Sequence, residues 1–535
     1  MAQKLFDKAS LVMIPSQYKE GKIYNIKPED QSSSFEFERG SAATRVNSSG
    51  LIEQVGVGDI ESVTNSDFNT TDNWVTGSTT SSFTVTNGIA TIQGDANSFN
   101  TRIGQTLSLE ANKSYFIKVR IKSNDGNYWR IRGYDNISGY FDITNDNNTE
   151  FNDITYVYNA PSGMNGVPIL YISSYFQNGT TDFSVDFASV KEINTDTPRL
   201  DYSGTEPALL LEPQRTNVIT TSQGNGSIWG WGSDAVPNNT TRLDNQPSIS
   251  GNNDAFLFTR NEGTTGWFGF PNISVTSGLE YTYSIFIKPT TTTEIKLNLV
   301  SFQPQPSVVY SFESNSFTTE NNATGKIQSL ANGWYRISMI YTNGFTANQI
   351  RHTLSDGGSA YVFGGQLEQG SYATSYIPTN GQTETRLADD SVATGLGSIA
   401  GQSEGTLFAY FKTIGDSATP YISLNKNNTV GNRVLIYNNS GVSAEIRVEG
   451  VVQASITSST QGLIKAAFAY KANDFAFYIN GSQIGTDSSG ITFSAGVLNE
   501  LNLGFGAQDG AEIKQIILFP TKLTDTELQQ LTSNT

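Results

Sequence analysis

The sequence predicts an all-β protein with several domains. Its 535 residues exceed what one hydrophobic core usually supports, so more than one core is expected. Short runs of alternating apolar and polar residues recur along the chain, separated by Gly and Asn turn signals. The segment LTDTELQQLT, near the end, is the one convincing helix signal. These features predict three β-sandwiches or jelly rolls, a small N-terminal β framework and one short C-terminal helix.

The N-terminal framework spans residues 1–57. Phe35 and Phe37 alternate with charged residues, and the segment ATRVN resumes an extended pattern after Arg39-Gly40. A framework of this length, without disulfide or metal, buries too little apolar surface to be stable alone. We therefore expect it to be completed by another part of the chain.

The following segment, residues 58–195, is predicted to form a first jelly roll. In KSYFIKVRIKS, Tyr115, Ile117, Val119 and Ile121 share one face of a strand, and TDFSVDFASVKEI closes the segment with the same alternation. The next segment, residues 217–379, follows this plan through EYTYSIFIKP and YVFGGQLEQG. The likeness of these strand pairs predicts an internal repeat of one domain type.

The last sandwich, residues 396–535, follows a linker at residues 380–395. Its clearest hairpin is DFAFYINGSQIG, in which Asn480-Gly481 favours a type I′ turn. The final helix begins with a capping-box pattern, Thr524 and Glu527.

Composition excludes several functional classes. The net charge of −17 and pI near 4.6 disfavour binding to a phosphate backbone. No run of about 18 apolar residues predicts a membrane helix, and the apolar run Leu11 to Ile14 is too short for a signal-peptide core. We therefore expect the chain to be made and kept in a cytoplasm until it is released. The absence of cysteine excludes disulfides, thiolate metal sites and cysteine nucleophiles.

The connecting segments carry a family resemblance. They read ATRVN followed by GLIE at residues 43–53, PRLDY at 198–202, LLLEPQRTN at 209–217, GGQLEQGSYATSYIPT at 364–379 and TRLAD at 385–389. Together they resemble virion proteins of tailed bacteriophages, especially fibre and appendage proteins. The resemblance covers residues 1–57 and 196–535. In that family the GLIE segment runs within a few residues into PRLDY, so the resemblance implies that residues 196–216 complete the N-terminal framework and that residues 58–195 are an inserted domain. It implies a concanavalin-A-like (laminin-G-like) last domain, whereas the inserted first sandwich resembles a carbohydrate-binding module in general pattern.

The resemblance implies a structural, adhesive role without catalysis. It implies a homotrimeric head or tail fibre, exposed on the released virion. The N-terminal segment would bind other virion proteins and the sandwiches would contact host surface glycans. Two alternatives remain open: a purely architectural capsid-decoration or collar protein, and a polysaccharide depolymerase with binding modules. The sequence does not separate head from tail attachment, and it names no receptor.

Aromatic residues in two loops are the candidate glycan-binding residues. Sugar-binding proteins stack the apolar faces of pyranose rings on exposed aromatic side chains, with polar groups nearby. The segment NYWRIRGYDNISGYFD interleaves such residues with arginines, and NEGTTGWFGFPN places two more in a Gly-rich loop. The candidates are Tyr128, Trp129, Tyr134, Tyr140, Trp267 and Phe268. The alternative is that these large aromatics pack in a core.

No cofactor is expected, and no catalytic residue is proposed. Asp142, Asp186, Glu192, Asp509 and Glu512 could ligate calcium, but no loop has the regular acidic spacing of a calcium site. The single histidine, His352, precedes a turn and is interpreted as an ordinary strand-end residue. No pair of carboxylates stands out for glycoside hydrolysis.

Overall fold

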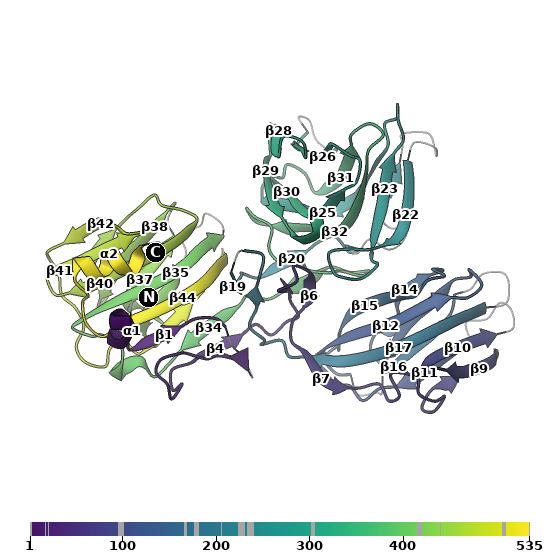
Figure 1. The fold of residues 1–535 in the computed structure, drawn as a ribbon, viewed down its shortest axis with the longest axis horizontal. Coiled ribbons are helices and arrows are strands. Elements are labelled where there is room, and N and C mark those ends of the chain that lie inside the picture. Colours follow the sequence, from purple (N-terminus) through teal and green to yellow (C-terminus); the bar gives the residue numbers. More distant parts are fainter. Residues whose placement is uncertain are drawn as a thin grey trace. The chain divides into compact units, whose positions relative to one another are not determined.

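The computed structural model confirms an all-β, multi-domain fold (Figure 1). It describes residues 3–533 except 17, 20, 95–100, 165–167, 176–180, 205, 223–229, 233–239, 301–304, 415–419, 439 and 505–509. In these ranges the helices are α1 (Gln3–Lys8), α2 (Asp525–Thr532) and two 3₁₀ turns, η1 (Ala331–Gly333) and η2 (Leu396–Ser398). The predicted capping box is present: Thr524 accepts from the Glu527 backbone, and Glu527 accepts from that of Thr524. None of the described helices is long and apolar enough to span a membrane.

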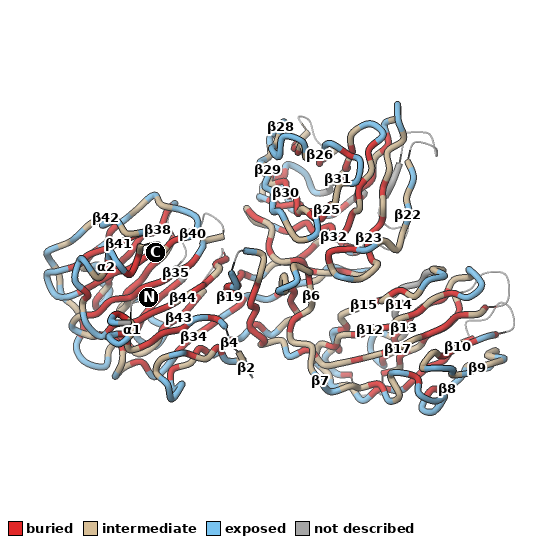
Figure 2. The backbone as a smooth tube through the Cα atoms, in the orientation of Figure 1, coloured by how far each residue is buried: buried red, intermediate tan, exposed pale blue. Residues whose placement is uncertain are grey.

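The chain divides into two units, each made of segments that are far apart in sequence. Unit 1 contains Met1–Ser49, Thr195–Arg215 and Thr385–Thr535, and unit 2 contains Gly50–Asn194 and Thr216–Glu384. Figure 2 shows buried stretches along the strands of each sandwich and exposed residues on the connecting turns. Short strands lie where the chain passes between units: β5 (Thr44–Val46), β6 (Ile52–Gln54), β20 (Arg215–Asn217) and β33 (Glu384–Arg386).

Unit 1 is a two-sheet sandwich. The first sheet has the order β18-β19-β44-β35-β40-β41-β42, and β1 also pairs with β44. Its strands are β1 (Leu11–Met13), β18 (Leu200–Asp201), β19 (Ala208–Leu211), β35 (Glu404–Ile414), β40 (Leu463–Lys471), β41 (Asp474–Ile479), β42 (Ser482–Asp487) and β44 (Gly510–Phe519).

The second sheet of unit 1 has the order β2-β3-β4-β34-β43-β36-β37-β38-β39. Its strands are β2 (Tyr18–Lys19), β3 (Lys22–Ile23), β4 (Phe35–Glu38), β34 (Asp390–Ala393), β36 (Pro420–Lys426), β37 (Thr429–Asn438), β38 (Val442–Val448), β39 (Val451–Ile456) and β43 (Glu500–Leu503).

The predicted N-terminal framework is not separate from the last sandwich. Strand β1 pairs with β44 in the register Leu11↔Leu518, and β19 pairs with the same strand. In the other sheet, β4 pairs with β34. Phe35 and Phe37 lie in the same buried cluster as the apolar residues of the last sandwich. The framework therefore gains stability from both sheets of that sandwich as well as from residues 195–215.

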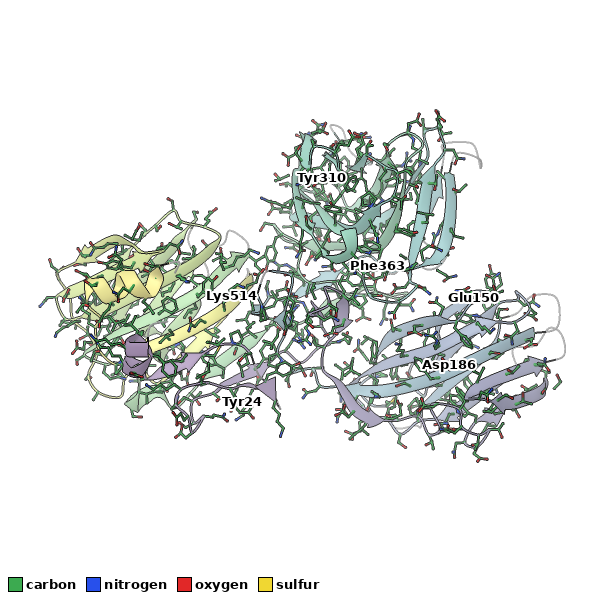
Figure 3. The ribbon with its side chains drawn as sticks, in the orientation of Figure 1. Tyr24, Glu150, Asp186, Tyr310, Phe363 and Lys514 are labelled. Atoms are coloured by element: carbon green, nitrogen blue, oxygen red, sulfur yellow. The ribbon has the colours of Figure 1, made fainter. Side chains whose placement is uncertain are left out.

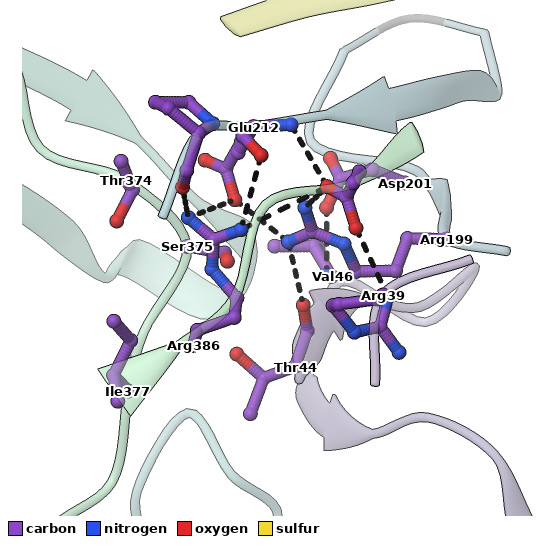
Figure 4. A network of polar contacts seen from close by, with 12 residues as sticks. Arg39, Thr44, Val46, Arg199, Asp201, Glu212, Thr374, Ser375, Ile377 and Arg386 are labelled. Atoms are coloured by element: carbon purple, nitrogen blue, oxygen red, sulfur yellow. Dashed lines mark hydrogen bonds and ion pairs between the residues drawn. The ribbon is translucent and has the colours of Figure 1, made fainter. Parts of the chain in front are cut away.

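A buried ionic cluster joins the three segments of unit 1 (Figure 4). Asp389 bonds to Arg199 and lies 3.2 Å from Arg39, while Glu212 lies 2.7 Å from Arg199 and 3.5 Å from Arg386. All five side chains are at most 3% exposed. Burial lowers the pKa of Arg39 to about 10, whereas for Arg199 Asp389 and Glu212 outweigh burial and raise the pKa. Removing one member of such a cluster costs about 3–5 kcal/mol, because it leaves an uncompensated buried charge.

The first sandwich of unit 2 has a six-stranded sheet and a five-stranded sheet. The six-stranded sheet has the order β15-β12-β17-β10-β9, with β7 on β17; the five-stranded sheet has the order β14-β13-β16-β11-β8. The strands are β7 (Val57–Glu61), β8 (Val75–Thr76), β9 (Thr80–Thr86), β10 (Ile89–Gly94), β11 (Arg102–Thr106), β12 (Ser114–Ser123), β13 (Trp129–Asp135), β14 (Gly139–Asp146), β15 (Asn152–Asn159), β16 (Ile169–Ser174) and β17 (Thr181–Ile193).

The second sandwich repeats this order over five strands of each sheet and adds β28 and β29 at the edges. Its sheets run β22-β23-β32-β25-β30-β29 and β21-β24-β31-β26-β27-β28. The strands are β21 (Gly230–Gly232), β22 (Thr240–Gln246), β23 (Ala255–Arg260), β24 (Trp267–Ser274), β25 (Glu280–Pro289), β26 (Glu294–Leu299), β27 (Ser307–Ser311), β28 (Ser316–Asn321), β29 (Thr324–Ser329), β30 (Tyr335–Thr342), β31 (Ala347–Leu354) and β32 (Ser359–Gln369). In this shared order β11, β16 and β13 correspond to β24, β31 and β26.

The segment GSYATSYIPT packs on one sheet of the second sandwich. Thr374 donates from its backbone and its hydroxyl to Glu368, at 2.9 and 2.6 Å. Arg336 donates to the Thr374 carbonyl and, at 2.9 Å, to the hydroxyl of Ser284. Ser284 on β25 is fully buried although it faces away from the sandwich core. This segment therefore covers the outer face of the β25 sheet, which gives the resemblance motif a structural role.

Candidate functional site

The five-stranded sheet of the first sandwich turns a row of arginines and tyrosines away from the core. Along β13, Trp129 and Ile131 face the core and are fully buried. Arg130 and Arg132 alternate with them and face the other side of the sheet, where Arg130 is 6% exposed and Arg132 is half-buried. The antiparallel register places Arg130 and Arg102 on either side of Ser173, and Arg132 beside Tyr171. We call the outward side of this sheet the Arg–Tyr face. Its residues are Arg102, Gly104, Tyr128, Arg130, Arg132, Tyr134, Tyr171, Ser173 and Tyr175.

Two arginines of the Arg–Tyr face stack on tyrosine rings. The guanidinium of Arg102 lies 4.5 Å from the ring centroid of Tyr171, and that of Arg130 lies 5.3 Å from that of Tyr175. Tyr128 lies beside Tyr175, with ring centroids 6.3 Å apart. Stacking over a ring restricts a long arginine side chain, so less conformational entropy is lost when its planar fork binds a ligand.

A glycine and a serine shape the floor of this face. A Cβ on Gly104 would lie 2.6 Å from a ring carbon of Tyr171, so the glycine lets that ring lie across β11. Ser173 is 2% exposed, and its hydroxyl has no hydrogen-bond partner among the described residues. A buried hydroxyl without a partner is costly, and a ligand oxygen would satisfy it.

The opposite face of the same sandwich has a different character. Lys118 and Arg120 on β12 both form ion pairs with Asp153, at 2.8 and 3.3 Å. Arg120 also pairs with Asp186 at 3.1 Å; Asp186 is labelled in Figure 3. The Lys118 ammonium lies 5.3 Å from the ring centroid of Phe187. Lys118 and Arg120 are therefore paired with carboxylates of neighbouring strands, whereas the ammonium of Lys122 lies 5.2 Å from the ring centroid of Phe151.

The second sandwich has an equivalent arrangement with the partners exchanged. The guanidinium of Arg351, on β31, lies 4.1 Å from the ring centroid of Trp267, on β24. Gly269 occupies the position that corresponds to Gly104, and Asn298 lies opposite Arg351 on β26. Trp267 is half-buried, and its indole N–H has no hydrogen-bond partner among the residues described. We call this the Trp–Arg face.

The structure separates the six predicted site residues into three groups. Tyr128, Tyr134 and Trp267 are half-buried and lie on the outward faces described above. Trp129 is 0% and Phe268 is 1% exposed, and both lie in hydrophobic cores, which corrects the prediction that they form sugar platforms. The physical reason is strand alternation, which turns these two side chains inward. The side chain of Tyr140 lies outside the described part of the chain, although its backbone pairs with Tyr134 in β14.

The sequence analysis missed Arg102, Tyr171, Tyr175 and Arg351. These residues lie on strands separated in sequence from the predicted loops, and the register brings them together. The alternation of Tyr171 with Leu170 and Ile172 was a usable signal, because it marks the tyrosine as outward-facing.

His352 is a core residue of the second sandwich, not a strand-end residue. It is fully buried, its Nδ1–H donates to the Phe268 carbonyl at 3.0 Å, and its ring stacks on Phe268 with centroids 4.6 Å apart. Burial lowers the pKa of His352 to about 3, although the hydrogen bond to Phe268 opposes this. The imidazole is therefore neutral at ordinary pH.

The calcium candidates are engaged in ion pairs where the structure describes them. Besides Asp186, Glu192 lies 2.8 Å from Lys113 and Glu512 lies 2.9 Å from Lys412. Asp509 and the side chain of Asp142 lie outside the described part. The described residues contain no cluster of three or more metal-ligating side chains.

Comparison with known proteins gives structural likenesses of low similarity. No protein-family model matches the chain, and no curated protein matches it. A CBM4 structure is 16% identical, covering 28% of this chain and 99% of that chain, with a TM-score of 0.20. The CBM40 of Ruminococcus gnavus IT-sialidase, bound to α2,3-sialyllactose, is 20% identical, covering 26% and 91% (TM-score 0.22). The tandem CBM22-1–CBM22-2 of Paenibacillus barcinonensis Xyn10C is 12% identical, covering 59% and 99% (TM-score 0.23). At these scores the likenesses carry no argument about function.

Proposed function

We propose that this chain is a structural, adhesive protein of a tailed-bacteriophage virion that binds host surface glycans through the Arg–Tyr and Trp–Arg faces. The virion role rests on the resemblance of the connecting segments in residues 1–57 and 196–535. The glycan-binding role rests on the structure of the two sandwiches. Trimeric assembly and attachment to other virion proteins through the N-terminal segment are part of the same proposal.

One observation carries the glycan-binding role. In each sandwich an aromatic ring contacts an arginine on the outward side of one sheet. The two sheets correspond in strand order, and the contacts lie on corresponding strands. Residues that serve packing alone are usually turned inward, as Trp129 and Phe268 are. An outward ring beside a guanidinium offers an apolar surface for a sugar ring and donors for its oxygens. Two such faces in one chain, multiplied by assembly, would raise avidity without any new contact.

Glycan binding is tested with the full-length protein on an array of bacterial surface polysaccharides. We expect binding that falls at least about tenfold when Tyr171→Ala and Trp267→Ala are combined. The matched control is Phe187→Ala, which removes an aromatic ring that also lies under a cation, but on the opposite sheet. Equal loss in the control, or no binding to any glycan, contradicts this role and favours the purely architectural alternative.

The virion role is tested by immunogold labelling of intact particles. Residues 1–49 and 385–535 belong to one unit, so antibodies to these two segments report on the same body. One antibody should therefore recognise unit 1 and another the inserted residues 58–195. We expect both to label a projection of the particle. Absence of label from purified particles contradicts the virion role.

A further inference from the structure

One edge of the first sandwich carries no charge. Strand β9 (Thr80–Thr86) lies at the end of the six-stranded sheet, and among the described strands it pairs with β10 alone (Figure 1). Residues 73–94, which contain β9 and the turns on either side of it, include no Asp, Glu, Lys or Arg, although 16% of the chain is charged. Proteins usually place charged residues or proline on such edges, because an open row of backbone groups pairs with any strand that reaches it. The β9 edge lacks this protection.

The other long edge strands in the described part of the chain are protected. Each one of five or more residues except β39 carries at least one charged residue, and these strands are β7, β14, β15, β22, β28, β29 and β42. Strand β39 has none, but the backbone N–H of Ile491 donates to the side chain of Gln453 on this strand at 3.1 Å, so a later segment lies against it. Strand β22 corresponds to β9 in the second sandwich and carries Arg242 and Asp244, paired at 2.6 Å. The open, uncharged edge is therefore particular to the first sandwich.

The register shows which backbone groups of β9 face the open edge. The chain turns back at Asn87-Gly88, two residues of positive φ, so the residue pair that closes this turn shares two hydrogen bonds. Hydrogen-bonded pairs alternate along an antiparallel ladder, and Phe83 and Val85 fall between them. The N–H and C=O groups of these two residues therefore point to the open edge, where no described residue bonds to them. Their half-buried side chains pack against the core and hold the strand in place.

We propose that β9 pairs with β9 of a second copy of this chain, antiparallel and about a twofold axis, so that the two six-stranded sheets become continuous. A twofold axis lets the same surface serve both partners, and each open backbone group then meets its complement in the other copy. This inference goes beyond glycan binding and does not depend on it. The contact is one strand wide, so the association is weak and requires concentrated protein.

The charge of the chain favours a second copy as the partner. A net charge of −17 makes most surfaces of two copies repel each other, so the copies approach closely only through an uncharged region. The β9 edge meets this condition in both copies at once. Its outward side chains, such as Ser82 and Thr84, place no like charges opposite one another. Val75 of β8, the neighbouring edge strand in the chain, is 73% exposed and adds apolar surface beside this contact. A strand of a basic protein would instead be attracted to the acidic surfaces.

The first test is a cross-linking experiment on the full-length protein with the substitution Thr84→Cys. Thr84 is exposed on β9, and the chain has no cysteine of its own, so a short bis-maleimide joins two copies only through this position. We expect a cross-linked dimer whose yield rises with protein concentration and with added salt, because salt screens the repulsion between acidic copies. The matched control is Thr241→Cys, an exposed threonine on β22, which should give much less dimer. Equal yields from the two variants overturn the proposal.

The second test introduces a charge of either sign on the same strand. Thr84→Glu and Thr84→Lys should each raise the dissociation constant for self-association at least about tenfold, because a twofold axis brings like charges close together. Long-range repulsion alone predicts the opposite for Thr84→Lys, which lowers the negative charge. Sedimentation velocity at several concentrations measures the association, and Thr241→Glu should leave it unchanged. A trimer held by other surfaces would persist in every variant, and only its further association would change.

Two further measurements keep the outcomes separate. Circular dichroism verifies that each variant is folded, and the polysaccharide array should show the same glycan binding in Thr84→Glu as in the unmodified protein. Self-association that neither Thr84 variant weakens overturns the pairing of β9. Absence of any concentration-dependent association in the unmodified protein overturns it as well. Neither result bears on glycan binding, which the array measures independently.

Discussion

In the first sandwich an arginine of β11 lies over a tyrosine of β16, whereas in the second an arginine of β31 lies over a tryptophan of β24. Five strands of each sheet follow the same order in the two sandwiches, and in that order β11 corresponds to β24 and β16 to β31. The contact is therefore retained while the two residue types exchange strands. This teaches that the contact across the sheet, and not the residue at either position, is the common feature of the two faces.

The two sandwiches differ more in their interiors and on the other sheet. His352 occupies the core position that corresponds to Ile172. The segment around Thr374 covers the outer side of the second six-stranded sheet, whereas ion pairs occupy that side in the first. The two sandwiches therefore share a strand topology but differ in the residues that pack in the core and on the outer side of the six-stranded sheet.

The largest expected effect is that acid lowers the stability of the second sandwich more than that of the first. The pKa of His352 is about 3 when folded and near 6.5 when unfolded, so below pH 6.5 the unfolded state binds a proton that the folded state does not. The second sandwich should then lose about 1.4 kcal/mol of stability per pH unit, reaching about 4 kcal/mol near pH 3. Hydrogen exchange in β31 between pH 7 and 4 measures this loss.

The control for the acid effect is His352→Leu, which cannot take up a proton. The difference in stability between this variant and the unmodified protein should shrink or reverse as pH falls. Parallel pH curves for the two proteins would contradict the effect.

The two glycines at corresponding positions should respond differently to alanine. A Cβ on Gly269 would lie 1.9 Å from the Ile350 carbonyl oxygen, which is backbone, whereas on Gly104 it would meet the movable ring of Tyr171. We expect Gly269→Ala to destabilise the second sandwich by about 3 kcal/mol, at the upper end for overpacking, and Gly104→Ala to cost about 1 kcal/mol. Scanning calorimetry of the whole chain, with transitions assigned by hydrogen exchange, measures both. Equal costs would contradict this account of the two close approaches.

The Gly104→Ala variant should also bind glycan more weakly than the unmodified protein. Gly104→Ala displaces Tyr171, so we expect a loss of about 1.4 kcal/mol in glycan affinity, which is about tenfold. The matched substitution Ala90→Gly changes a buried residue of the same sandwich on its other sheet and should leave affinity unchanged. Retained affinity in Gly104→Ala would show that the position of Tyr171 does not matter for binding.

The smallest expected effect tests the exchange of partners directly. A double-mutant cycle on Arg102→Ala and Tyr171→Ala should give a coupling energy of about 0.5–1 kcal/mol, typical of a partly exposed cation–π pair. The exchanged protein, Arg102→Tyr with Tyr171→Arg, should keep most of that coupling, as the second sandwich does with Trp267 and Arg351. Chemical denaturation measures the cycle. Zero coupling would mean that the stacked geometry contributes nothing to stability.

The sequence predicts the elements better than the site. Alternation in KSYFIKVRIKS and the capping box at Thr524 are local signals, and both elements are present. The site depends on which strands become neighbours, and the sequence does not show the register that brings Arg102 to Tyr171. Nor does the segment NYWRIRGYD show by residue spacing alone that the side chain of Trp129 faces the core. Likewise, the apolar residues of β1 and β4 predicted strands, but not that their partners lie in the last sandwich.

The pairing of Leu11 with Leu518 has a consequence for biosynthesis. A ribosome makes the chain from its N-terminus, so β1 must wait until nearly the whole protein has been translated before its partner strand exists. Each sandwich of unit 2 closes its strand order within a continuous segment and can fold while translation proceeds. Unit 1 therefore completes last, and during synthesis its N-terminal apolar strands remain exposed as a substrate for chaperones.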